Sequence, residues 1–151
     1  ANMRLNSEGR SIQFSGNTLD NKKYDLRDSR GKVVLIQYWG TWSETCKSDM
    51  KLIKEAYNDY SRRGFEVVSV SLDYDVNELK GYLRKNPLPW KQLYADGNLD
   101  SPLAEQLGIA MVPTMILVGA DGKVIDRNVI ATDIDRLLSR QFRRSAKRDR
   151  K

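Results

Sequence analysis

The chemistry that this sequence could perform centres on residues 42–46, which read Trp-Ser-Glu-Thr-Cys and contain the only cysteine. The segment follows an apolar run and Gly40, where the pattern becomes that of a helix. A thiolate at a helix N-terminus is stabilised by unpaired N–H groups and by the helix dipole, so Cys46 is a candidate nucleophile toward disulfides. Ser43, three residues earlier, offers a hydroxyl that has no low-pKa anion and forms no S–S bond. The Ser-x-x-Cys pair therefore cannot cycle between a dithiol and a disulfide.

The same residues also have a purely structural interpretation. Ser43 and Thr41 are both good helix N-caps, and Thr41 with Glu44 gives the Thr-x-x-Glu pattern of a capping box. We favour Cys46 as a small buried hydrophobic side chain. Burial and the nearby Glu44 would raise its pKa, whereas the helix end would lower it, so the sequence leaves a reactive thiol open. The apolar stripe predicted for this helix consists of Cys46, Met50, Ile53, Tyr57 and Tyr60.

Composition excludes several kinds of site. The chain has no histidine and one cysteine, so it cannot build a zinc or iron–sulfur site from the usual ligands, nor form an internal disulfide. We expect no metal and no cofactor. No apolar run reaches the roughly 18 residues of a membrane-spanning helix, so we predict no transmembrane segment in this chain. Residues 1–10 are polar and lack a signal-peptide pattern, although the start at Ala1 leaves room for a leader or an upstream anchor.

The net charge of +6 comes from the C-terminal end of the chain. Residues 140–151 contain seven basic side chains and one acidic side chain, whereas the rest of the chain has 19 basic and 19 acidic residues. A basic tail can contact phosphates, an anionic membrane or an acidic partner, but chain ends are commonly solvated and frayed. Because the body of the domain is neutral, we predict no nucleic-acid binding.

Apolar patterns predict the order of the helices and strands. Stretches at 12–14 and 22–26, around the turn signal Gly16-Asn17, predict an N-terminal β-hairpin. Residues 33–39 are apolar on both faces, which predicts a central strand covered by helices on each side. Asp121-Gly122 predicts a type I′ turn between two later strands. The remaining strands are expected at 65–72, 90–94, 114–118 and 123–126, and the helices after Gly40, at 75–85, at 101–107 and from Thr132 or Asp133.

This order of elements predicts the fold class. Alternating strands and helices imply parallel strands with right-handed crossovers, and the closing hairpin adds antiparallel edges. We therefore expect an α/β fold with a central mixed sheet flanked by helices and an N-terminal β-hairpin extension. The chain divides into an N-terminal extension at 1–10, one domain at 11–139 and a basic C-terminal tail at 140–151.

Several stretches occur in an order that identifies a family. The chain resembles the thioredoxin superfamily, and more narrowly the TlpA/ResA-like thiol–disulfide oxidoreductases, over about residues 11–139. The resemblance implies the thioredoxin fold. The stretches that carry it are Gly31-Lys32-Val33-Val34-Leu35, Tyr38-Trp39-Gly40-Thr41-Trp42, Val112-Pro113-Thr114 and Asp121-Gly122-Lys123-Val124.

The resemblance also assigns expected roles to residues. Ser43 stands where the family carries its nucleophilic cysteine, and Cys46 stands where it carries the resolving cysteine. The Val112-Pro113 bond is expected to be cis, beside the motif, where the backbone pairs with an extended substrate. Gln37 aligns with a buried carboxylate that thioredoxin itself uses as a proton acceptor. The substrate-binding residues that the resemblance implies are Trp42, Glu44, Thr45, Val112, Pro113 and Thr114.

Two functions follow from these observations. The first is a domain of a thiol–disulfide oxidoreductase whose dithiol site is impaired by Ser43, with monothiol chemistry at Cys46 as its enzymatic variant. The serine is compatible with either a native residue or a Cys-to-Ser replacement. The alternative is a non-catalytic module that binds peptides or proteins. A peroxiredoxin-like peroxidase is disfavoured, because residues 39–46 lack the proline of its Pro-x-x-x-Thr-x-x-Cys pattern.

The expected partners and location also rest on the resemblance. We expect protein or peptide thiols and disulfides to bind in the groove near Pro113, and we expect a monomer. The resemblance implies an extracytoplasmic location, periplasmic or membrane-tethered, with a cytoplasmic location as the alternative.

Overall fold

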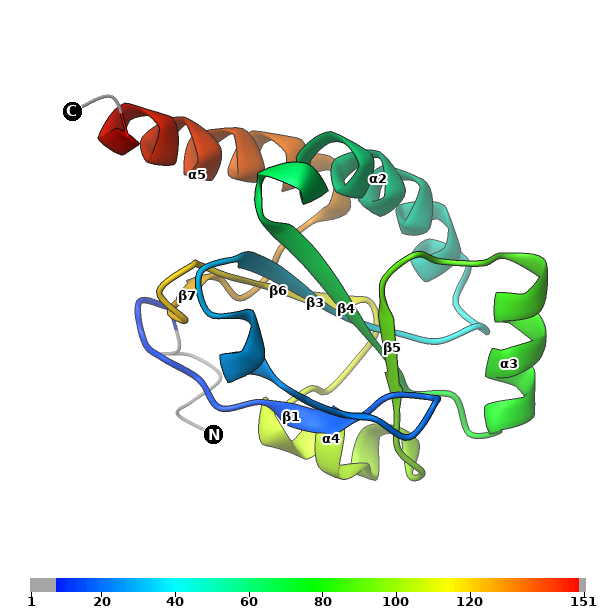
Figure 1. Ribbon diagram of the computed structural model, residues 1–151. Coiled ribbons are helices and arrows are strands. Elements are labelled where there is room, and N and C mark those ends of the chain that lie inside the picture. The colour runs from blue at the N-terminus through cyan, green and yellow to red at the C-terminus, as the bar shows by residue number, and fades with distance from the viewer. Residues whose placement is uncertain (1–7, 150–151) are drawn as a thin grey trace.

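The structure is a computed structural model that describes residues 8–149, with side chains described for residues 8–143. A five-stranded sheet in the order β5-β4-β3-β6-β7 forms its centre (Figure 1). Strand β4 is parallel to β3 and β5, whereas β6 is antiparallel to β3 and β7, so the predicted mixed sheet is confirmed. The strands are β3 (Val33–Trp39), β4 (Phe65–Ser71), β5 (Lys91–Tyr94), β6 (Thr114–Val118) and β7 (Val124–Asp126).

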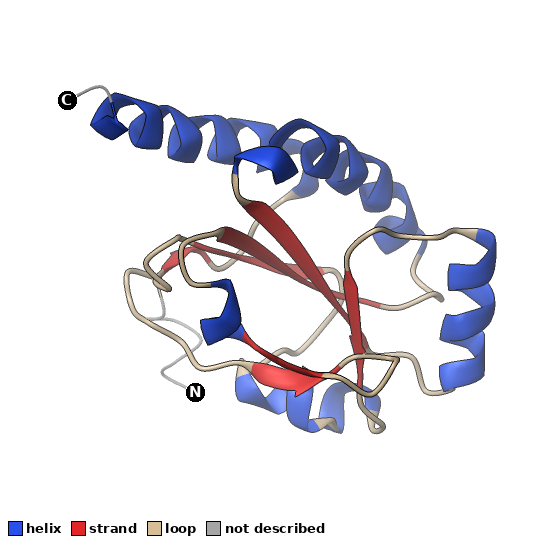
Figure 2. Cartoon of the chain, in the orientation of Figure 1, coloured by secondary structure: helices blue, strands red, loops and turns tan. Residues whose placement is uncertain are grey.

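Helices cover both faces of this sheet, as Figure 2 shows. All seven residues of β3 are buried, as predicted for a central strand, and their side chains alternate between two cores. Leu35 and Trp39 lie in the core under α2 and α5, whereas Ile36 and Tyr38 lie in the core under α4 and the N-terminal hairpin. The helices are α2 (Glu44–Tyr60), α3 (Val76–Lys85), α4 (Pro102–Gln106) and α5 (Ile134–Asp149).

Short 3-10 helices and one glycine shape the ends of these elements. Helix α2 buries Cys46, Met50, Ile53 and Tyr60 of the predicted stripe, whereas Tyr57 is half-buried. The helix ends at Tyr60, and Gly64 ends the following 3-10 helix in a left-handed conformation with φ 104°. Helix α5 packs on α2 through Phe142, whose ring stacks on Tyr60 at 5.4 Å between centroids. The core thus includes residue 142. The 3-10 helices are η1 (Leu26–Ser29), η2 (Ser61–Arg63), η3 (Asn98–Asp100) and η4 (Ala131–Asp133).

The N-terminal hairpin is present, but its strands lie elsewhere than predicted. Strand β1 (Ser15–Asn17) pairs with β2 (Lys23–Asp25), whereas residues 12–14 are not part of it. The predicted turn at Gly16-Asn17 is wrong, because both residues belong to β1 and the chain reverses after Asn17. A Cβ at Gly16 would collide with Leu103 of α4. Close packing, and not a turn, is therefore what requires this glycine.

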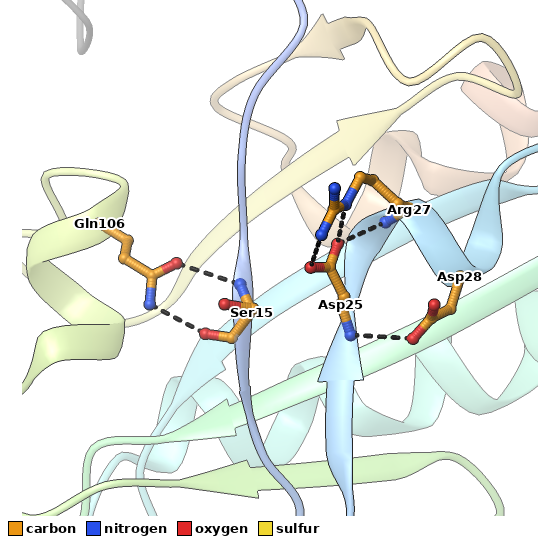
Figure 3. A network of polar contacts seen from close by, with 5 residues as sticks. All are labelled: Ser15, Asp25, Arg27, Asp28 and Gln106. Atoms are coloured by element: carbon orange, nitrogen blue, oxygen red, sulfur yellow. Dashed lines mark hydrogen bonds and ion pairs between the residues drawn. The ribbon is translucent and has the colours of Figure 1, made fainter.

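Side chains fix the hairpin against α4 and η1 (Figure 3). The Gln106 side chain accepts a hydrogen bond from the Ser15 N–H at 3.1 Å and donates one to the Ser15 carbonyl at 2.9 Å. It thereby occupies both backbone groups of Ser15 as a neighbouring strand would. Asp25 accepts hydrogen bonds from the backbone and guanidinium of Arg27, and its own N–H donates to Asp28 at 3.2 Å.

The predicted type I′ turn between β6 and β7 is also wrong. A type I′ turn needs a positive φ at both central residues. Among the described residues of this turn only Gly122 has a positive φ, 82°, and the Gly122 N–H donates to the Gly119 carbonyl at 2.9 Å. Gly122 therefore follows the two central residues and does not form one of them.

The Tyr38 hydroxyl provides a test of how the sheet holds α4. It donates to the Leu103 carbonyl at 2.6 Å in a buried site, and burial raises the pKa of Tyr38, so the hydroxyl stays protonated. We expect Tyr38→Phe to lower the free energy of unfolding by about 1–3 kcal/mol, because a buried carbonyl loses its partner. Urea denaturation measures this loss. Tyr74→Phe, on an 81% exposed ring, is the control, and equal effects of the two variants would contradict the assignment.

Candidate functional site

Helix α2 begins directly after the motif loop, residues 40–43, which leaves the end of β3. Ser43 is the N-cap of α2, and its hydroxyl accepts a hydrogen bond from the Cys46 N–H at 3.2 Å. The helix start expected at Ser43 is therefore observed. The capping box expected between Thr41 and Glu44 does not form, because Thr41 lies outside the helix and bonds elsewhere. Glu44 instead lies 3.6 Å from Lys47, on the surface.

Cys46 is the free thiol of the site and is fully buried. It belongs to the core that also contains Trp39, Met50 and Ile53. Burial raises the pKa of the Cys46 thiol, and the Asp49 and Asp73 carboxylates add to this, whereas hydrogen bonds from Ser43 and Gly40 oppose it. The thiol is therefore protonated and inaccessible near neutral pH. Cys46 thus packs in the core as a small hydrophobic side chain does.

A buried carboxylate holds the motif loop, and the sequence interpretation missed it. Asp73 is 3% exposed and accepts hydrogen bonds from the Thr41 N–H at 3.0 Å and from the Thr41 hydroxyl at 2.6 Å. Its other oxygen accepts from the Ser71 hydroxyl at 2.5 Å. Asp73 thus ties the loop after β3 to the end of β4. Its place just after a buried parallel strand is the signal that could have identified it.

The Val112–Thr114 segment lies beside the motif. Thr114 pairs with Tyr38 in the register of β6 and β3, so Pro113 lies next to Trp39, where the chain enters the motif loop. The Val112–Pro113 peptide bond is cis, as the resemblance implied. Segments about seventy residues apart in sequence are therefore brought to one edge of the sheet.

Exposed apolar side chains surround this edge. Trp42 is 52% exposed and Met111 is 66% exposed, and Tyr74 projects from the loop that follows β4. The Trp42 ring lies against Gly40, where a Cβ would collide with it. Trp42, which the resemblance implied as a substrate-binding residue, is thus a surface aromatic, whereas nothing in the sequence pattern singled out Tyr74. The other predicted contact residues here, Glu44 and Thr45, are also exposed.

Gln37 is buried in a polar chain below the site. Its side-chain oxygen accepts from the Ser69 hydroxyl at 2.5 Å, and Ser69 in turn accepts from the Trp90 Nε1–H at 2.7 Å. The Gln37 amide donates to the Met50 sulfur at 3.6 Å. Because a side-chain amide does not take up a proton near neutral pH, this arrangement satisfies buried polar groups without supplying a proton acceptor.

The described part of the chain lacks two other kinds of feature. No group of three or more His, Cys, Asp or Glu residues suited to a metal ion occurs there. No helix among the same residues is both long and apolar enough to span a membrane.

Comparison with known proteins places this geometry in a family. Residues 31–124 match the family model described as thioredoxin-like. Thiol-disulfide oxidoreductase ResA of Bacillus thuringiensis subsp. konkukian is 30% identical over 71% of this chain and 60% of the relative. The chain thus spans about 60% of the length of that relative.

Solved structures share the fold. The C-terminal domain of a protein described as a thiol-disulfide oxidoreductase of Bacteroides thetaiotaomicron superposes with a TM-score of 0.80 at 25% identity, over 91% of this chain and 97% of that one. The thioredoxin domain of a thiol-disulfide oxidoreductase of Bacteroides vulgatus gives a TM-score of 0.77 at 22% identity, over 86% of this chain and 93% of that one. The expected thioredoxin fold is confirmed, and the chain belongs to the thioredoxin-like family.

Proposed function

We propose that this chain is a domain of the thiol–disulfide oxidoreductase group that binds extended polypeptides but does not itself run a dithiol–disulfide cycle. The observation that carries the proposal is the pairing of Ser43 with Cys46. The Ser43 oxygen serves as the N-cap at the position where the family carries the attacking sulfur. With one thiol in the chain, a mixed disulfide formed here would have no internal thiol to resolve it.

The burial of Cys46 favours binding over monothiol chemistry. A monothiol mechanism needs an accessible thiolate that attacks a substrate disulfide. Cys46 is fully buried, and burial raises the pKa of its thiol. Both features reduce the fraction of attacking thiolate, so the non-catalytic module is the stronger form of the proposal.

The sheet edge around Pro113 supports polypeptide binding. Trp42 in the motif and Met111, two residues before Pro113, offer exposed apolar surface. Val112 lies before the start of β6, so its backbone is outside the strand pairing and could form backbone hydrogen bonds with an extended chain. We propose that protein or peptide thiols and disulfides bind here, to a monomer outside the cytoplasm. The likeness to ResA supports the first part of this statement.

The first prediction concerns turnover. We expect the chain not to accelerate the reduction of insulin disulfides by dithiothreitol, because resolution within the chain is impossible. Insulin turbidity measures the rate, with an ordinary thioredoxin as the positive control. A rate comparable with that control would overturn the claim that two thiols are needed.

The second prediction restores the missing thiol. Ser43→Cys should form an intrachain disulfide with Cys46, because residues three apart at a helix start share a face and a disulfide needs Cα atoms within about 7 Å. The helix N-terminus should also lower the pKa of the new thiol. Free-thiol titration after treatment with oxidised glutathione measures formation of the bond. The two thiols give up two electrons and two protons, which convert one oxidised glutathione into two reduced glutathione molecules.

Ser48→Cys is the matched control for this variant, since residues two apart on a helix do not face each other. We expect it to form no intrachain disulfide, so that the buried Cys46 thiol stays free even if glutathione caps the exposed thiol at position 48. If Ser43→Cys also leaves the Cys46 thiol free, the local geometry is not that of the family and the functional proposal fails with it.

The third prediction concerns Cys46 itself. We expect a disulfide-exchange reagent at neutral pH to react with Cys46 at least about tenfold more slowly in the folded protein than in denaturant, because the thiol is buried and its pKa is raised. Absorbance of the released thiolate measures both rates. Equal rates would favour the monothiol enzyme instead.

A further inference from the structure

A polar hollow lies beside the motif loop, between the start of α2 and the helix α3. Its volume is about 530 Å³, within the range of small-ligand sites. Thr41 and Lys47 line it from the motif side, and Gly81, Tyr82, Arg84 and Lys85 line it from α3. Because Thr41 belongs to the loop that presents Trp42, the hollow adjoins the edge proposed to bind polypeptides.

The charge of this hollow is positive. Lys47, Arg84 and Lys85 are basic, and Glu78 is the acidic residue of the lining. Arg84 and Lys85 are exposed and form no ion pair within the described part of the chain. Lys47 lies 3.6 Å from the 90% exposed Glu44 carboxylate, a weak pair, and its Nζ also lies over the Tyr82 ring of the lining, 5.7 Å from the centroid. The cations of the hollow are therefore available to an anion.

Gly81 keeps the hollow open. It lies inside α3, where glycine disfavours the helix relative to alanine. A Cβ at Gly81 would meet only the Arg84 Nη2 atom at 3.8 Å, an ordinary contact, and Gly81 has no positive φ. Neither packing nor backbone geometry requires glycine here. A larger side chain would instead project into the hollow, so the glycine leaves this space free for a ligand.

We propose that this hollow is a subsite for an aspartate or glutamate side chain of the polypeptide that binds at the Trp42 edge, an inference that rests on the proposed function. A guanidinium such as that of Arg84 matches a carboxylate through paired N–H donors, and Lys47 and Lys85 add charge. The positive charge of the hollow favours a carboxylate, and Thr41, the neighbour of Trp42 in the chain, lines it, so the occupant we propose is a carboxylate of the same polypeptide.

Two fluorescein-labelled peptides test the proposal. They share one apolar sequence around a central serine and differ only in carrying flanking glutamates or flanking glutamines. By fluorescence anisotropy on the full chain, we expect the glutamate peptide to bind about tenfold more tightly, as charge-assisted hydrogen bonds predict. The preference should shrink with added salt.

Charge variants locate the preference. The double variant Arg84→Gln with Lys85→Gln should bring the two peptides to within about twofold of each other. Lys80→Gln is the matched control, since Lys80 is an exposed cation of the same helix outside the lining. An equal loss of preference in the control would overturn the site and indicate only the overall charge.

Gly81→Leu tests the space. We expect it to weaken binding of the glutamate peptide at least about fivefold while the thermal unfolding midpoint stays level or rises, because leucine favours the helix. Gly81→Ala, which adds one carbon, is the control for folding. It should raise the unfolding midpoint, which would show that a side chain at position 81 does not disturb α3. Unchanged affinity in folded Gly81→Leu would overturn the subsite.

The remaining outcomes separate this inference from the proposed function. If both peptides bind equally, polypeptide binding stands and the acidic subsite is wrong. If neither peptide binds, the proposed function fails and the subsite fails with it. Displacement of the glutamate peptide by millimolar inorganic phosphate would also overturn the assignment, since it would indicate a general anion site.

Discussion

The burial of β3 on both faces is the constraint on which the rest of this structure depends. Its seven residues place alternate side chains in two separate cores, so helices must cover the sheet on both sides. Since no residue of β3 is exposed, the first exposed residues after it lie beyond its C-terminal end, in the loop that leads into α2. Pairing with β6 brings Pro113 to the same point. The place of the candidate site is therefore a consequence of how the sheet is covered.

Asp73 converts this placement into a defined loop conformation. A buried carboxylate without a cation beside it needs hydrogen-bond donors, and Thr41 and Ser71 supply them. The bonds join the ends of β3 and β4, which fixes how Trp42 and Ser43 are presented. The same negative charge disfavours a thiolate nearby. The loop before Ser43 is therefore tied to the end of β4 by hydrogen bonds, beside a motif that contains a single thiol.

Under the proposed function, Ser43 leaves the architecture of the site intact without supplying a thiol. The hydroxyl still caps α2, so the helix start needs no rearrangement. Cys46, which has no second thiol in the chain, is part of the core. The buried Gln37 amide forms hydrogen bonds with Ser69 and Met50. With one thiol, the chain cannot form an internal disulfide, whereas Trp42 still offers exposed apolar surface. This separation of scaffold and chemistry is the basis for proposing a binding role.

The sequence by itself determined the type and order of the elements, the burial of Cys46, the helix start at Ser43 and the family, because periodicity and motifs are local. Tertiary structure decided what local patterns cannot encode. Gly16 signalled a turn, yet its role is to let Leu103 approach a strand. Asp73 meets Thr41 across 32 residues, and the hollow beside Gly81 exists only where α3 faces the start of α2. Such contacts depend on strand register and helix placement, which a single sequence does not specify.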